Sequence, residues 1–180
     1  MMFRLRGFNL NLLVVAVLAS ASACGCGTTV ERKQKKEMTL LRLHLETSSD
    51  KVPYTSNVSV LRASPIQMVI HNQSFLDERS IIEAALVDLG HGFAIQLQFD
   101  QRGRFHLETI TQAARGQRIA IFSEFGEMRW LAAVKIVQTV TDGILTFTPD
   151  ASREEAERIV RGLNNFKRRQ NKTEHFPEKS

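Results

Sequence analysis

The chain has 180 residues, of which 43% are hydrophobic, 24% charged and 7% aromatic, and its formal net charge is +5. This length fits one domain with flanking tails. Plentiful apolar residues and only two cysteines exclude collagen-like, disulfide-dense and wholly disordered chains. A protein with several membrane spans is also excluded, because only one stretch stays uncharged for long enough to matter.

Residues 1–23 have the pattern of an export signal. Two arginines precede an apolar segment at residues 10–18, and a run of small residues then ends at Cys24. Ala21-Ser22-Ala23 fits a signal peptidase, and the stretch also resembles a bacterial lipobox, in which a lipid is attached to the cysteine thiol. We expect lipidation of Cys24. Ordinary cleavage before Cys24 and an uncleaved helical anchor are the alternatives, although the apolar part is shorter than the roughly 20 residues that span a bilayer.

The mature chain is expected to have three parts on the periplasmic side of a bacterial envelope. They are a polar tether over 24–37, a globular domain over 38–166 and a basic disordered tail over 167–180. We interpret the basic runs at 32–36 and 167–172 as solvated flanks near anionic lipid head groups. No nucleic-acid partner is expected, because these runs lack aromatic stacking partners and an exported chain rarely meets nucleic acid.

The first half of the domain is predicted to be mostly strands. Leu41, Leu43 and Leu45 alternate with polar residues, which is the period of a half-buried strand. A helix is expected from a cap at Asp77 to a stop at Gly90, because apolar residues between them recur at helical spacing. A second strand is expected to begin with Val58 and Val60, and others are expected at residues 66–70 and 93–99.

The second half mixes strands with two helices. A turn at 100–103 is expected to lead into a strand through Phe105 and Leu107. Thr109 opens a sequence with the form of a capping box, so a short helix is expected from there to Gly116. Further strands are expected at residues 118–123 and 144–148, and residues 128–140 are expected to form one long strand or two broken ones.

The last helix has the best-defined start. Ser152 and Glu155 form a capping box, and Ala156, Ile159 and Leu163 form one apolar stripe. The predicted element order is β-β-β-α-β-β-α-β-β-β-α. This order favours an α+β fold with a mixed or antiparallel sheet and helices packed on one face.

The second half of the chain contains a series of turn and core motifs. In chain order they are Ile119-Ala120-Ile121, Glu124-Phe125-Gly126, Ala132-Ala133-Val134-Lys135-Ile136 and Ser152-Arg153-Glu154-Glu155-Ala156. With these motifs, residues 75–165 resemble the head subdomain of the first periplasmic domain of the SecD/SecDF protein-export family. Val134 stands where the family commonly has proline, and Ser152 where it has threonine. The resemblance implies a SecD-head-like fold. The family's transmembrane helices have no counterpart in this sequence, so we expect no translocation motor.

The sequence shows no arrangement typical of an active site. Its histidines include no pair at zinc-ligand spacing, and His44 and His106 are expected on the polar sides of strands, solvated unless they approach in space to hold a metal. Ser123 and Ser152 are better explained as a strand end and a helix cap than as nucleophiles. We therefore expect no enzyme, catalytic residue, metal, cofactor or small-molecule substrate.

Trp130, the sole tryptophan, is the leading candidate for a binding residue. Exposed indole rings are effective anchors for partners. With Phe122 and Phe125, Trp130 would form an aromatic rim around one sheet edge. The alternative is that Trp130 simply fills the core of the sheet.

These observations favour a non-enzymatic envelope lipoprotein that binds polypeptide or a protein partner, accessory to protein export. An exposed sheet edge or the aromatic rim would hold an extended segment through backbone hydrogen bonds. A structural or assembly lipoprotein that docks on a fixed membrane complex is the first alternative, and a hydrolase is the second.

Overall fold

The computed structural model describes residues 27–47 and 53–174. The helix α2 (Gly27–Gln34) belongs to an N-terminal unit that ends at Lys35, and a compact unit that begins at Lys36 holds every strand of the described part. Much of the segment that we expected to be a polar tether is therefore helical. The export signal and Cys24 lie outside the described residues.

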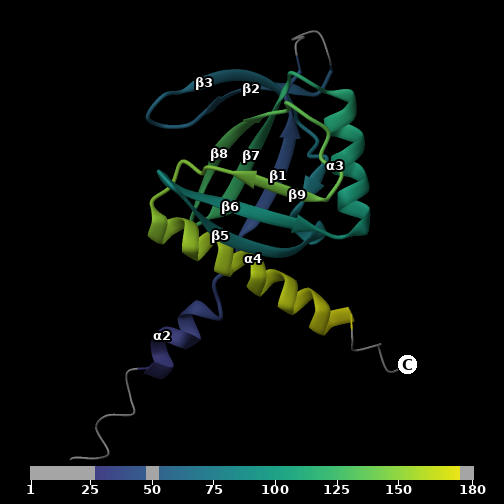
Figure 1. Ribbon diagram of the computed structural model, residues 1–180. Coiled ribbons are helices and arrows are strands. Elements are labelled where there is room, and N and C mark those ends of the chain that lie inside the picture. Colours follow the sequence, from purple (N-terminus) through teal and green to yellow (C-terminus); the bar gives the residue numbers. More distant parts are fainter. Residues whose placement is uncertain (1–26, 48–52, 175–180) are drawn as a thin grey trace, which may run out of the picture. The chain divides into compact units, whose positions relative to one another are not determined.

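The compact unit contains three antiparallel sheets (Figure 1). Its strands are β1 (Leu40–Leu45), β2 (Thr55–Val60), β3 (Ile66–His71), β4 (Leu76–Asp77), β5 (Ile81–Leu89), β6 (Gly92–Phe99), β7 (Arg118–Phe125), β8 (Glu127–Lys135) and β9 (Ile144–Phe147). The sheets have the strand orders β4-β1-β7-β8, β2-β3 and β5-β6-β9. The helices are the short 3-10 helix η1 (Glu78–Ser80), α3 (Gln101–Ala113) and α4 (Arg153–Glu174). The expected α+β fold class is confirmed.

One hydrophobic core joins the four-stranded sheet, the three-stranded sheet and both long helices. Leu41 of β1, Ile121 of β7, Leu97 of β6, Leu107 of α3 and Ile159 of α4 all belong to it, each at most 1% exposed. Burying such side chains stabilises the fold by about 1.5–3 kcal/mol each. The helices and the three-stranded sheet therefore cover the same face of the four-stranded sheet.

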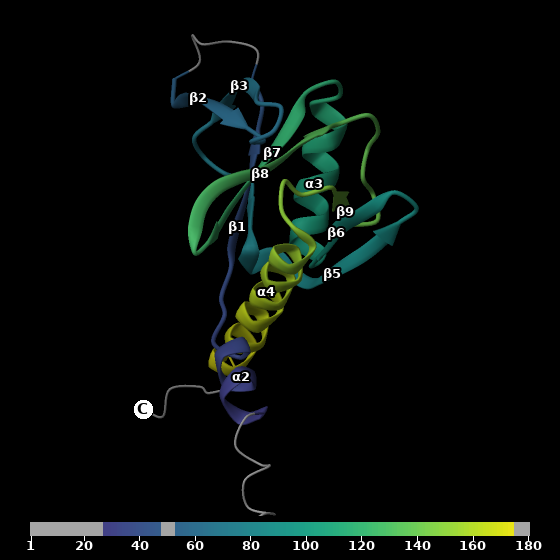
Figure 2. The ribbon, with the colours of Figure 1, turned by 90° about the vertical axis from the view of Figure 1, so that its left-hand side faces the viewer.

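The opposite face of the four-stranded sheet is covered by the hairpin β2–β3 (Figure 2). Val60, Met68 and Ile70 of the hairpin pack with Ala120 of β7 in a second, smaller apolar cluster. Ala120 lies between Ile119 and Ile121, which belong to the larger core, so β7 buries both of its faces.

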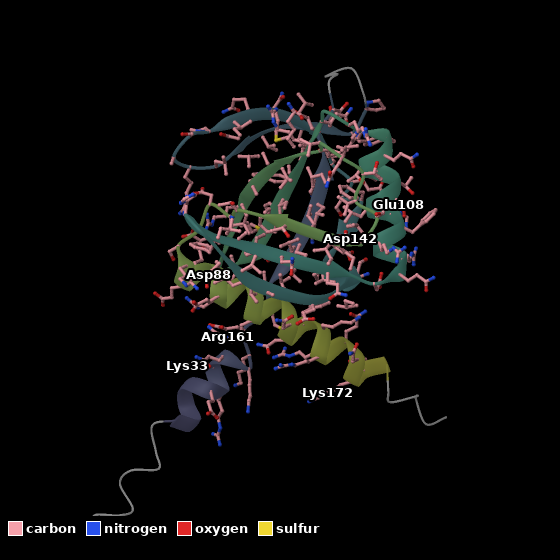
Figure 3. The ribbon with its side chains drawn as sticks, in the orientation of Figure 1. Lys33, Asp88, Glu108, Asp142, Arg161 and Lys172 are labelled. Carbon is pink, nitrogen blue, oxygen red and sulfur yellow. The ribbon has the colours of Figure 1, made fainter. Side chains whose placement is uncertain are left out.

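The helix α4 is bound tightly to the chain that leads into β1. The Ser152 hydroxyl accepts the Glu155 N–H at 3.2 Å, which is one of the two bonds of the predicted capping box, and the Glu155 carboxylate binds Arg129. The Glu37 carboxylate accepts bonds from Arg158 Nε at 3.0 Å and Arg161 Nε at 2.8 Å, and Figure 3 shows Arg161 near the middle of the helix. The helix continues past the expected boundary at residue 166 to Glu174.

Asn164 of α4 closes the outer edge of β5. Its side-chain carbonyl accepts the Ala84 N–H at 2.9 Å, and its amide group donates to the Ala84 carbonyl at 2.8 Å. An unpaired strand edge invites pairing with another chain, so this amide both positions α4 and protects β5.

The predicted helix between Asp77 and Gly90 is wrong, because this stretch forms β5. A β-bulge between Ile81 and Glu83 shifts the register, so the buried Ile81 and Ala84 are three residues apart. The helical spacing came instead from Ile81, Ile82, Ala85, Leu86 and Leu89, and it misled because Ile82 and Leu89 are apolar residues on exposed positions of β5. The cap itself is real, since Asp77 Oδ1 accepts the Arg79 N–H at 3.0 Å, but it starts only η1.

The predicted strand through Phe105 and Leu107 is also wrong, because α3 already begins at Gln101. Asp100 is its N-cap and accepts the Gly103 N–H at 2.7 Å. The buried positions of α3 include a glycine and a threonine, which weakened the apolar pattern. Thr109 therefore lies within the helix instead of capping it.

The strand predicted over 128–140 is shorter than expected. It ends at Lys135, and Thr111 of α3 holds the following segment by accepting the Val140 N–H at 2.9 Å. The strands predicted at 41–45, 66–70, 93–99, 118–123 and 144–148 are confirmed with small changes at their ends. Val58 and Val60 were expected to begin a strand, but they lie at the end of β2.

Gly162 lets α4 approach the chain before β1 closely. A Cβ atom there would lie 2.2 Å from Thr39 Oγ1 and 2.9 Å from the Thr39 backbone nitrogen. We expect Gly162→Ala to lower the free energy of unfolding by about 1–3 kcal/mol through overpacking. Urea denaturation measures the change.

The matched control is Gly90→Ala, because a Cβ atom at Gly90 meets nothing within 4 Å. Its stability should be unchanged or slightly raised. Equal stability of both variants would show that α4 does not need this close approach.

Candidate binding groove

The outer face of the four-stranded sheet, together with the hairpin β2–β3, forms a groove of about 370 Å³, which we call the aromatic groove. β1, β7 and β8 supply one wall and β2 and β3 the other. Its lining residues are Arg42, His44, Ser56, Val58, Ile70, Asn72, Phe122 and Trp130. The groove is thus a half-open, largely apolar slot between two layers of strands.

Three rings form the floor of the aromatic groove. Phe122 and Trp130 are cross-strand partners on β7 and β8, and their ring centroids are 5.1 Å apart at 63°. The Trp130 indole also meets the His44 imidazole edge to face, at 5.3 Å and 76°. Such edge-to-face pairs are favoured by the charge distribution of aromatic rings. Trp130 is half-buried, so one part of the ring packs on the sheet and another stays accessible.

His44 connects the sheet to the hairpin. It was expected on the polar side of its strand, but it is only 8% exposed. Its Nδ1–H donates to the His71 carbonyl at 2.9 Å, because a carbonyl can only accept. Burial lowers the pKa of His44; the bond to His71 raises it and the charge of Arg42 lowers it further, with a net decrease. The imidazole is therefore neutral at neutral pH.

A charged cluster fixes the loop that follows β2 to the edge of β8. The Asp150 carboxylate accepts the Arg62 N–H at 2.8 Å and Arg62 Nε at 3.2 Å. The Asp150 N–H donates to the Leu131 carbonyl at 2.7 Å, and Arg129 bonds to both the Asp150 carbonyl and Glu155. These contacts hold one end of the hairpin over the four-stranded sheet.

The structure brings together two of the three predicted rim residues. Phe122 and Trp130 share the aromatic groove, whereas Phe125 packs against the larger core, under Arg158 of α4, whose guanidinium carbon lies 4.9 Å from the ring centroid. Phe122 and Phe125 are three positions apart on β7, so the alternation of a strand places their side chains on opposite faces of the sheet. A continuous rim of the three rings is therefore not formed.

Sequence reasoning missed the hairpin wall of the groove, which Val58 and Ile70 line, and the place of His44 in it. A signal was present, because Ile119-Ala120-Ile121-Phe122 is apolar at every position. Such a strand needs cover on both faces.

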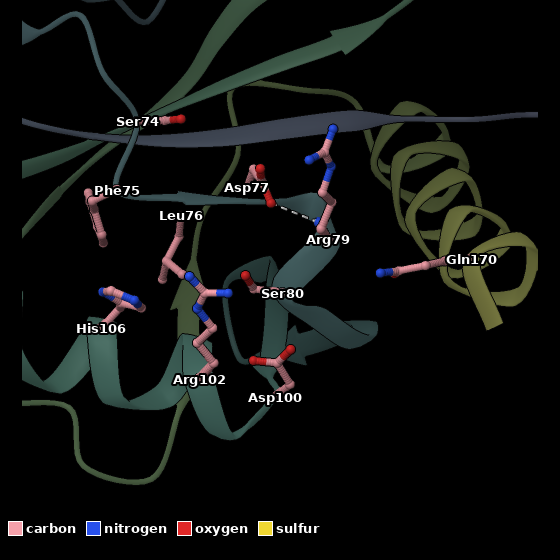
Figure 4. Close-up of a pocket in the computed structure, with 10 residues that line it drawn as sticks. All are labelled: Ser74, Phe75, Leu76, Asp77, Arg79, Ser80, Asp100, Arg102, His106 and Gln170. Carbon is pink, nitrogen blue, oxygen red and sulfur yellow. Dashed lines mark hydrogen bonds between the residues drawn. The ribbon is translucent and has the colours of Figure 1, made fainter. Parts of the chain in front are cut away.

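The idea that His44 and His106 approach each other is wrong. His106 lies on α3, where it is exposed and lines a separate polar pocket of about 390 Å³ (Figure 4). Asp77 and Asp100 in that pocket serve as helix caps. Within residues 27–47 and 53–174, no three histidine, cysteine or acidic side chains cluster to hold a metal ion.

No helix in the described part of the chain is long and apolar enough to cross a membrane. The sequence matches no family model and no curated protein.

The fold is nevertheless similar to solved structures of SecDF. One of them belongs to work on a membrane component SecDF that enhances protein export. It has a TM-score of 0.55 at 17% identity, and the similarity covers 79% of this chain and 70% of that chain. A crystal structure of SecDF in a super-membrane-facing form has the same TM-score and identity. There the similarity covers 78% of this chain and 21% of that chain. The resemblance indicated by the sequence is confirmed at the level of the fold.

The lowered pKa of His44 makes stability depend on pH. In the unfolded chain this histidine has its ordinary pKa of 6.5. Near and below that pH, the unfolded chain therefore binds a proton more readily than the folded chain. The free energy of unfolding should therefore fall as the pH drops from about 7.5 to about 5.5. His44→Asn should show a smaller fall in urea denaturation.

The control is His91→Asn, because His91 is exposed in the turn between β5 and β6. This variant should keep the pH dependence of the native chain. An unchanged pH dependence in His44→Asn would contradict the assignment.

Proposed function

We propose that this protein is a non-enzymatic, lipid-anchored envelope protein whose aromatic groove binds an extended segment of polypeptide, in a role accessory to protein export. The observation that carries the proposal is the groove itself, in which Trp130 and Phe122 offer accessible ring surface between two layers of strands. Similarity to a component that enhances protein export supports the role, and the groove supports the mode of binding.

The hairpin offers an extended segment a place to pair. β2 pairs with β3 alone, so its second edge belongs to no strand ladder among the described residues. Ser56 and Val58 of β2 also line the aromatic groove. A bound segment would add backbone hydrogen bonds along β2 and insert an apolar side chain against Trp130, which is the chemistry of strand addition.

Phe125 belongs to this proposal only as a structural residue. Its packing on the larger core places it away from the aromatic groove, so we assign binding to Trp130 and Phe122.

The alternative function is docking on a fixed membrane complex. A fixed assembly partner in the groove would give one stable cross-link from position 130 in cells, whereas transient clients would give many.

The sole tryptophan permits a direct test of binding. We expect the fluorescence of Trp130 to shift to shorter wavelength, saturably, when the chain is titrated with a reduced, carboxymethylated protein that lacks tryptophan. Phe122→Ala should weaken this binding about tenfold. The native, folded form of the same probe should leave the spectrum unchanged.

Met128→Ala is the matched control, because Met128 lies on β8, the strand that carries Trp130, and is 72% exposed. It should bind the probe as the native chain does. Equal affinity of the Phe122→Ala and Met128→Ala variants would reject the groove as the binding site.

The anchor is tested separately, in a bacterial host. The native chain should incorporate a labelled fatty acid and remain with the membrane fraction, whereas Cys24→Ala should do neither. Cys26→Ala is the control and should retain the label. A labelled Cys24→Ala variant would contradict lipidation at Cys24.

A further inference from the structure

The last turns of α4 extend beyond the hydrophobic core. Asn165 is the last buried side chain of the helix, and the side chains of residues 167–173 are all exposed or half-buried. Figure 3 shows Lys172 near the end of this extension. The extension carries four basic residues, Lys167, Arg168, Arg169 and Lys172. Apolar packing therefore does not explain these turns.

We call these four residues, together with Arg79, the basic surface. At 3.6 residues per turn, Lys167 and Arg169 lie on opposite sides of α4, so the positive charge surrounds the end of the helix. Arg79 is exposed and lines the same pocket as Gln170 of α4 (Figure 4). Cations stabilise the C-terminal end of a helix, but that effect is confined to its last turn. Lys167 and Arg168 precede the last turn, so the charge exceeds what the helix itself requires.

The tether reaches the domain beside the same helix. Arg158 and Arg161 bind the Glu37 carboxylate, and Asn165 donates to the Glu37 carbonyl at 3.1 Å. Residues 24–36 separate this point from Cys24, and such a segment spans at most about 45 Å when fully extended. An anchored chain therefore keeps the middle of α4 within about 45 Å of the membrane, a step that rests on the lipid anchor proposed above.

We propose that the basic surface docks on the anionic phospholipid head groups of the membrane that holds the anchor. Charge complementarity identifies this partner, since head-group phosphates attract clustered lysine and arginine side chains. Figures 1 and 2 show the hairpin β2–β3 and α4 at opposite ends of the domain. Docking through α4 therefore turns the hairpin and the aromatic groove away from the bilayer, where a polypeptide can reach them.

The test uses the full chain purified from bacterial membranes and reconstituted with vesicles. One set contains phosphatidylcholine alone, and the other also contains about 30% phosphatidylglycerol. We expect backbone amides of residues 166–174 to exchange hydrogen for deuterium about tenfold more slowly in the anionic vesicles, and salt at about 0.5 M should abolish the difference. Vesicle flotation records binding in the same samples.

A triple variant, Lys167→Gln, Arg168→Gln and Lys172→Gln, should exchange equally fast in both kinds of vesicle. Glutamine is a good helix former, so exchange in phosphatidylcholine should match that of the native chain and report an intact helix. The control replaces three exposed basic residues elsewhere, Arg104, Arg115 and Lys135, by glutamine and should keep the slowing.

The outcomes separate this inference from the anchor. A chain that floats with both kinds of vesicle but exchanges equally in both has an anchor and no docking surface, which overturns the inference. A chain that floats only with anionic vesicles supports the docking surface and contradicts the anchor. Tighter binding of duplex DNA than of anionic vesicles, lost in the triple variant, would also overturn the inference.

Discussion

The four-stranded sheet must be covered on both of its faces, and the rest of the architecture follows from this requirement. β7 sets it, because Ile119 and Ile121 point into the larger core while Ala120 points the other way. Two helices and a second sheet cover the first face completely. The other face has only a two-stranded hairpin, fixed to the sheet by the Thr47–Val69 backbone bond and by the cluster around Asp150. Because the hairpin is narrower than the sheet, part of this face stays uncovered and forms the aromatic groove.

The helix α4 unites the parts of the domain that matter for its proposed role. It closes the larger core through Ile159 and Leu163, fixes the chain before β1 through Glu37, and extends a basic end past the core. The stability of the fold and the orientation proposed for the domain at the membrane therefore depend on the same helix. A change that loosened α4 from Glu37 would disturb both the fold and the direction in which the aromatic groove faces.

Much of the fold follows from the sequence, and the failures have local physical causes. Strands with regular alternation were found. The exposed apolar residues Ile82 and Leu89 gave β5 a helical spacing, and Gly103 and Thr111 concealed the buried face of α3. Trp130 and Phe122 were identified because aromatic residues stand out in a sequence. His44 and the hairpin wall were not, since a groove between distant strands depends on tertiary pairing that periodicity does not encode.

Asn164 has a consequence for how copies of this domain meet one another. The lipid anchor proposed above would concentrate them in two dimensions, where open strand edges meet often and can polymerise. By satisfying both backbone groups of Ala84, the amide interrupts the outer edge of β5 as a template for such growth. Crowding of neighbouring molecules is then compatible with independent, separately acting domains.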